Sequence, residues 1–80
     1  MRANREYELI VSKSGRAPAP LAAPDRVDQV EVVEIATGET VLLWDTAPAQ
    51  TSRLARALRT DLAQLESEVF LRRWRRWQPG

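Results

Sequence analysis

The residues with the strongest chemical character lie in one short segment near the carboxyl end of the chain, LRRWRRW at residues 71–77. Four arginines alternate there with two tryptophans: Arg72, Arg73, Arg75 and Arg76, with Trp74 and Trp77. Guanidinium groups bind phosphates, and indole rings stack on bases in proteins that bind single-stranded nucleic acid. The four arginines are therefore candidate nucleic-acid-binding residues.

A second interpretation makes the same segment the end of a helix. Arginines in the last turns of a helix complement its partial negative charge, and their long stems cover apolar surface. The tryptophans would then pack on the body of the protein. We favour this interpretation and expect any affinity for nucleic acid to be weak and unspecific. About two helical turns are too short an amphipathic surface for a membrane partner.

Catalytic and metal chemistry has little support elsewhere in the chain. Cysteine and histidine are both absent, which removes the commonest metal ligands and the usual general base. The glycines are isolated and form no phosphate-binding loop, and no serine has a histidine or second lysine to activate it. We therefore expect a non-enzymatic protein with no catalytic residue, no metal site and no cofactor.

Length and charge limit the remaining possibilities. Eighty residues predict one small domain over 1–80, and such a domain has a thin margin of stability. No segment has the apolar length of a membrane span or of a secretory leader, so we expect a soluble, cytoplasmic protein. The net charge is +1, but residues 1–50 contain five basic and eight acidic side chains, whereas residues 51–80 contain seven basic and three acidic ones.

Alternation, β-branched residues and a turn glycine together predict three strands. Residues 6–13 alternate with a period of two, and residues 27–36 are rich in β-branched side chains. Gly38 can adopt the positive φ that a tight hairpin or a bulge requires, so residues 39–45 are expected to pair with the second strand. Between the first two strands, the proline-rich segment 14–25 is predicted to be a flexible loop.

The remainder predicts one long helix that runs to about Trp77. Asp45 or Thr46 is a suitable N-cap, with Pro48 near the first helical position; Thr51 or Ser52 is an alternative cap. One apolar stripe is formed at helical spacing by Leu54, Ala55, Leu58, Leu62, Leu65 and Val69. Residues 78–80 form a short tail. The predicted fold is α+β, a three-stranded antiparallel meander packed against this helix.

Two surfaces exceed what this simple fold can bury. Strands two and three offer large apolar side chains on both sheet faces, whichever register the hairpin adopts. After Val69 the aromatic residues open a second helical stripe, rotated by about 100° from the first. One interpretation is that the proline-rich loop and the helix tail fold back over the second sheet face. We favour an interaction module that binds a second copy of itself, as a homodimer, or another protein. It would use the second sheet face and four candidate partner-binding residues: Trp44, Phe70, Trp74 and Trp77. The alternative is a small nucleic-acid-binding protein that uses the arginines.

Overall fold

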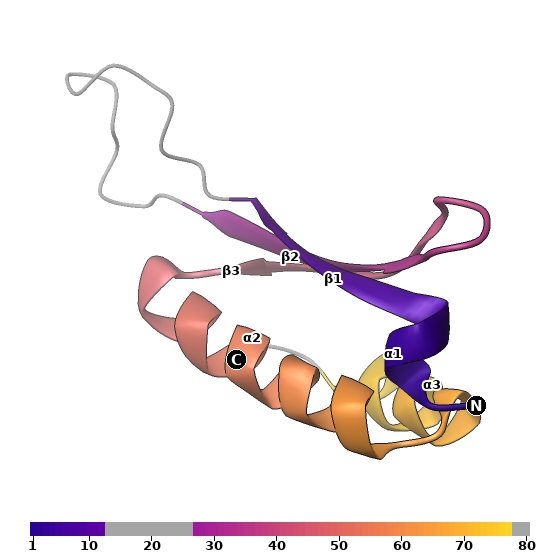
Figure 1. The fold of residues 1–80 in the computed structure, drawn as a ribbon. Helices are drawn as coiled ribbons and strands as arrows, with labels where there is room; N and C mark the ends of the chain where they lie inside the picture. Colours follow the sequence, from indigo (N-terminus) through magenta and orange to yellow (C-terminus); the bar gives the residue numbers. More distant parts are fainter. Residues whose placement is uncertain (13–26, 78–80) are drawn as a thin grey trace, which may run out of the picture.

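The computed structural model describes residues 1–12 and 27–77, and these form a two-layer α+β fold (Figure 1). The sheet contains β1 (Tyr7–Ser12), β2 (Asp28–Glu34) and β3 (Thr40–Thr46) in the order β1-β2-β3, with both pairs antiparallel. The predicted fold class and meander are confirmed. The predicted loop at 14–25 and the tail at 78–80 lie outside the described residues.

The β2–β3 hairpin has the predicted glycine-dependent turn. Gly38 has a φ of 76°, a conformation in which side chains with a Cβ are strained. The Glu34 N–H donates to the Glu39 carbonyl at 2.8 Å, and the Gly38 N–H donates to the Glu34 carbonyl at 2.8 Å. A register shift between Val32 and Val33 adds a bulge to the hairpin beside this turn.

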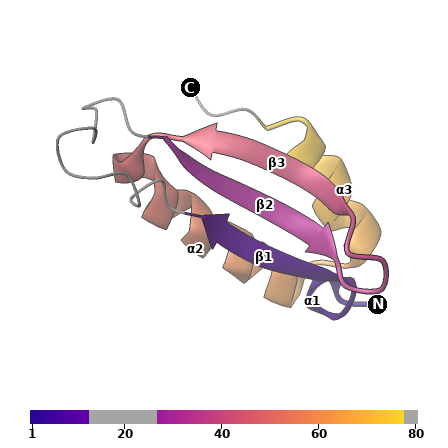
Figure 2. The ribbon, with the colours of Figure 1, turned by 90° about the horizontal axis from the view of Figure 1, so that it is seen from above.

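All the helices lie on one face of the sheet, as Figures 1 and 2 show from two directions. The helix α1 (Ala3–Glu6) is a single turn before β1 that the sequence did not predict. The helix α2 (Pro48–Gln64) begins with proline at its first position, as predicted. Its N-cap is Ala47, rather than Asp45 or Thr46, and no side chain caps it.

The start of α2 is held by a buried polar cluster. The Thr51 hydroxyl donates to Asp28 Oδ2 at 2.7 Å and is hydrogen-bonded to the Thr46 hydroxyl at 2.8 Å. All three side chains are at most 3% exposed. The cluster therefore joins β2, β3 and α2 by side-chain hydrogen bonds inside the protein, where such bonds are costly to lose.

The prediction of one continuous helix is wrong, because the chain breaks between α2 and α3 (Ser67–Arg75). Leu65 and Glu66 are extended, with ψ angles of 152° and 154°. The amino-terminal segment pairs with the break: the Ala3 N–H donates to the Leu65 carbonyl at 2.9 Å, and the Ser67 N–H donates to the Met1 carbonyl at 3.0 Å. These bonds satisfy backbone groups that a helix would otherwise pair internally.

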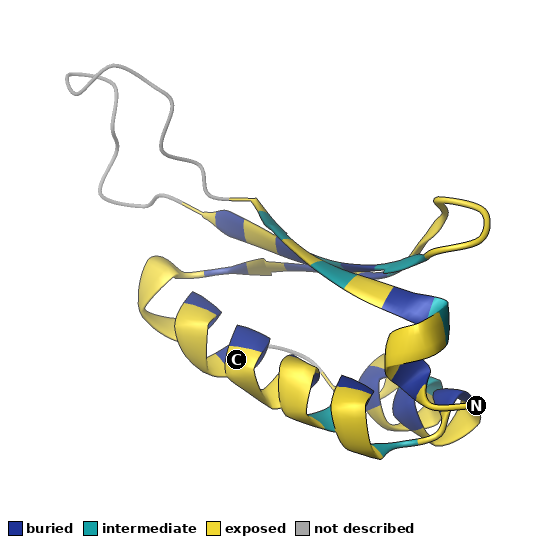
Figure 3. Cartoon of the chain, viewed as in Figure 1, coloured by how far each residue is buried: buried dark blue, intermediate teal, exposed yellow. Residues whose placement is uncertain are grey.

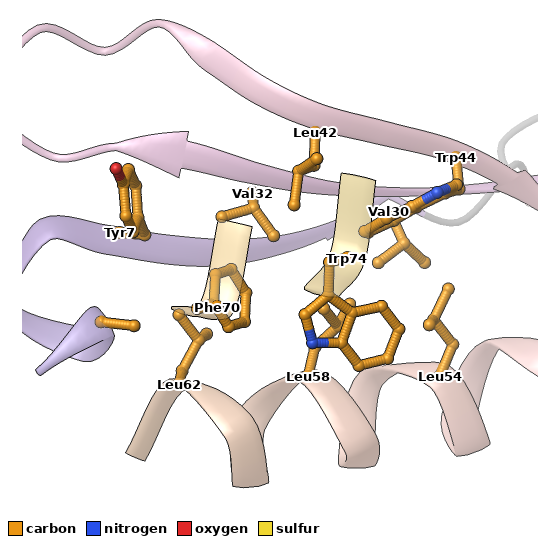
Figure 4. Packing of buried hydrophobic residues seen from close by; sticks show 11 residues of the cluster. Tyr7, Val30, Val32, Leu42, Trp44, Leu54, Leu58, Leu62, Phe70 and Trp74 are labelled. Atoms are coloured by element: carbon orange, nitrogen blue, oxygen red, sulfur yellow. The ribbon is translucent and has the colours of Figure 1, made fainter. Parts of the chain in front are cut away.

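The break places both helical stripes against one core (Figures 3 and 4). After it, Phe70 and Trp74 face the sheet and are 0% and 6% exposed, so the expectation that they serve another face is wrong. Val69, predicted to continue the first stripe, is instead 44% exposed. The largest side chains of this core come from every strand and from both long helices: Tyr7, Val30, Val32, Leu42, Trp44, Leu54, Leu58, Leu62, Phe70 and Trp74.

The second sheet face is mixed rather than apolar. Ile10 and Leu43 are exposed in one cross-strand row, but Glu31 lies between them on β2. The Thr40 hydroxyl donates to Glu31 Oε2 at 3.0 Å on the same face. Large apolar residues do occur on this face, as predicted, but acidic and polar side chains separate them.

Candidate functional site

A groove follows the outer edge of β3, between this strand and α3. Its walls are formed by residues 41–45 on the strand side and by Trp74, Arg75 and Trp77 on the other side. Seen from above, α3 extends past the β3 edge on the helix side of the sheet (Figure 2). A chain added at this edge would therefore lie over α3.

Hydrogen-bonding groups of the β3 backbone face this groove. The Glu34 N–H donates to the Glu39 carbonyl on the β3 side, and the Ile35 N–H donates to the Glu6 carbonyl on the β1 side. The backbone N–H and C=O groups of even-numbered β2 residues therefore point toward β3. Their partners on β3 are Leu42, Trp44 and Thr46. Because N–H and C=O directions alternate along a strand, the backbone groups of the intervening Leu43 and Asp45 point to the outer edge. No strand among the described residues pairs with that edge.

Three tryptophans form the inner end of the groove. Trp44 contacts Trp74 and Trp77 edge to face, with ring centroids 5.8 Å and 5.6 Å apart. Trp74 and Trp77 contact each other at 5.5 Å, and the Trp44 Nε1–H donates to the Trp77 carbonyl at 3.4 Å. Such aromatic pairs add stability beyond the area that they bury. The cluster fixes the carboxyl end of α3 against β3.

The structure brings three of the four predicted partner-binding residues to this groove: Trp44, Trp74 and Trp77. Trp44 and Trp74 are largely buried, at 9% and 6% exposed, so they shape the groove more than they offer surface. Trp77 is 37% exposed and can contact a bound chain. Phe70 is fully buried against Tyr7 and does not reach the groove.

The four arginines of the tail do not form one surface. Arg75 lines the groove beside β3, whereas Arg73 lines a second groove between α2 and α3. The Arg73 Nε lies 3.5 Å from Asp61 Oδ2, and the same carboxylate oxygen accepts a hydrogen bond from Trp74 Nε1 at 2.9 Å. Arg72 and Arg76 are exposed.

Several residues of both grooves were not singled out in the sequence. Leu43 is half-exposed on β3, and its edge position depends on strand order. Arg53 and Arg56 on α2 line the second groove with Arg73. Their spacing of three residues on one helical face was a signal that they act together. Their nearness to α3 follows only from the helix break.

The clearest pKa shifts lie away from both grooves, at the amino terminus. The Met1 ammonium donates to Glu66 Oε2 at 2.6 Å. This hydrogen bond and the attraction between the opposite charges raise the pKa of the amino group and lower the pKa of the Glu66 carboxyl. The pair connects the first residue to the break between α2 and α3.

Other kinds of site find no support in the described part of the chain. No group of three or more acidic side chains gathers there as metal ligands would. No helix of residues 1–12 and 27–77 has the length and apolar character needed to span a membrane. Comparison with known proteins gives no significant match to a family model, a curated protein or a solved structure. The groove geometry is therefore the basis for a functional proposal.

Proposed function

We propose that this protein is a non-enzymatic interaction module that forms a homodimer by pairing its β3 edges. The observation that supports this most directly is the outer edge of β3, which no strand of residues 1–12 and 27–77 covers, beside a groove lined by tryptophans. Backbone hydrogen bonds from an added strand supply affinity, and side chains of the groove supply specificity. A second copy of β3 fits this description.

The sequence of β3 suits antiparallel pairing with itself. Asp45 is the one charged residue of the strand, so pairing about Leu43 places it opposite Val41 and avoids a contact between like charges. Symmetric pairs of this kind are the commonest oligomers, because one surface serves both copies. Joining two β3 edges would convert two three-stranded sheets into one continuous sheet and remove an exposed edge from each copy.

The experiment compares two substitutions in one cross-strand row of the sheet. Leu43→Lys places a charge on the β3 edge, where two copies would bring like charges together. Ile10→Lys places the same charge on the same face at the opposite edge, on β1. We expect the wild-type chain and Ile10→Lys to sediment as dimers at high micromolar concentration, and Leu43→Lys to sediment as a folded monomer.

Two results would contradict the proposal. If the wild-type chain is a monomer at high micromolar concentration, the proposed homodimer does not form. Dimers that tolerate Leu43→Lys but dissociate in Ile10→Lys would place the contact on β1 instead. Circular dichroism of both variants separates loss of association from loss of folding.

A further inference from the structure

The two layers of the protein carry opposite charge. Residues 7–12 and 27–47, which contain the strands and the hairpin, include six acidic side chains and no basic one. Residues 48–77, which contain α2 and α3, include seven arginines and three acidic side chains. Two of those three are occupied, since Asp61 pairs with Arg73 and Glu66 pairs with the amino terminus. A polyanion is therefore attracted to the helical layer and repelled by the sheet.

The groove between α2 and α3 concentrates this positive charge. It is lined by Arg53 and Arg56 from α2, and by Arg73, Trp74 and Trp77 from α3. Within the described ranges, Arg53 and Arg56 have no acidic partner within ion-pair distance. Their guanidinium groups are exposed at the groove and available to an anionic ligand.

The groove also contains two indole rings, the buried one of Trp74 and the partly exposed one of Trp77. The buried indole of Trp74 is fixed by the hydrogen bond from its Nε1–H to Asp61. The same carboxylate forms an ion pair with Arg73 at the groove wall. Trp77 is held by ring contacts with Trp44 and Trp74, yet more than a third of its surface remains exposed. Phosphate-binding arginines beside a fixed, accessible indole are the combination that binds single-stranded nucleic acid.

We propose that the α2–α3 groove binds single-stranded nucleic acid, with Arg53, Arg56 and Arg73 on successive phosphates and a base stacked on Trp77. This site differs from the sequence-based candidate, because it draws two of its three arginines from α2. Duplexes are poorer ligands, since their bases are already stacked and cannot reach the indole. The inference does not require dimer formation: the three arginines line the α2–α3 groove and not the groove beside β3, although Trp74 and Trp77 line both grooves.

The test measures fluorescence anisotropy of dye-labelled oligothymidylate and oligouridylate with the full chain. The groove variant is Arg53→Ala/Arg56→Ala, and the matched control is Arg59→Ala/Arg72→Ala, which removes the same charge from exposed positions outside this groove. We expect the groove variant to weaken binding about tenfold or more and the control to weaken it about twofold. Comparing the two oligonucleotides tells whether DNA or RNA is preferred.

Salt and base dependence supply the second measurement. Three phosphate contacts on a single strand predict a slope of about −2 in the plot of log affinity against log salt concentration. Trp77→Ala should weaken oligonucleotide binding about tenfold. It should leave any binding of inorganic polyphosphate, which has no bases, unchanged.

Three results would overturn the inference: absence of binding by wild type at low salt, equal losses in the groove and control variants, or polyphosphate competing as well as the oligonucleotides. Each is distinguishable from failure of the dimer proposal, because Leu43→Lys should retain full oligonucleotide binding. Circular dichroism confirms that each variant is folded before its affinity is compared.

Discussion

Neighbouring residues of the basic tail have quite different environments, although the sequence presents them as one motif. Trp74 is buried and bonded to Asp61, whereas Arg73 next to it has a side chain that is 64% exposed. The tail is thus mainly a helix end that packs on the sheet, as the sequence interpretation favoured. Arg73 and Arg75 line different grooves, whereas Arg72 and Arg76 line neither of them.

A prediction at this scale concerns Thr51 in the buried polar cluster. Thr51→Val keeps the shape of the side chain but removes the hydroxyl that donates to Asp28. Because a hydrogen bond to a charged group is stronger than a neutral one, we expect a loss of about 1.5–3 kcal/mol in the free energy of unfolding. Thr60→Val, at an exposed position of the same helix, should change it by less than about 0.5 kcal/mol. Urea denaturation measures both, and equal losses would show that the cluster contributes nothing.

At the scale of elements, the break between α2 and α3 decides which residues reach the core. A continuous helix would keep the α2 stripe in line with Val69. The observed break turns Phe70 and Trp74 inward and leaves Val69 at the surface. Phe70 is then stacked on Tyr7 from the start of β1, with ring centroids 6.2 Å apart.

Adjacent substitutions test the break directly. Phe70→Ala should lower the free energy of unfolding by about 3–5 kcal/mol, because it leaves a cavity in the core. Val69→Ala removes two exposed methyl groups and should lower it by no more than about 0.5 kcal/mol. Thermal or chemical denaturation gives the comparison. The reverse order of losses would mean that the helix runs on without a break.

At the scale of the whole molecule, the first residue closes the chain onto the α2–α3 break. The ion pair between the Met1 ammonium and the Glu66 carboxylate contributes to the stability of the fold. The lowered pKa of Glu66 means that this stabilisation is present above the ordinary carboxyl value of 4.5 and is lost as pH falls through the lowered pKa. The raised pKa of the Met1 amino group means that it is present below 8.0 and is lost as pH rises through the raised pKa. The ion pair should therefore stabilise the fold between these limits.

Replacing Glu66 with glutamine tests this pH window. We expect Glu66→Gln to lower the melting temperature at neutral pH by a small amount, since the pair is exposed. The difference from wild type should shrink below the Glu66 pKa and above the amino-group pKa. Glu68→Gln, at another exposed position two residues away, is the control. A difference that stays constant across the whole pH range would assign the effect to something other than this pair.

Local sequence signals were sufficient for the strands, the hairpin and the start of α2. Alternation in residues 6–13, β-branched residues in 27–36 and the hairpin at Gly38 located the three strands to within two residues of their observed ends, and Gly38 marked the turn because it tolerates a positive φ. Pro48 marked the first turn of α2, where its missing N–H costs nothing. These features depend on residues that are close together in the chain, so they can be predicted from one sequence.

Tertiary structure decided the helix break, the burial of the aromatic residues and both grooves. No glycine or proline occurs near Leu65 and Glu66; the break is stabilised by hydrogen bonds from residues more than sixty positions away. Only this break turns Phe70 and Trp74 into the core and brings Arg73 beside Arg53 and Arg56. The sequence by itself determined which residues could form strands, helices and charged surfaces. Which surfaces meet was decided by long-range packing, because burying the aromatic rings outweighs the preference of residues 65 and 66 for a helix.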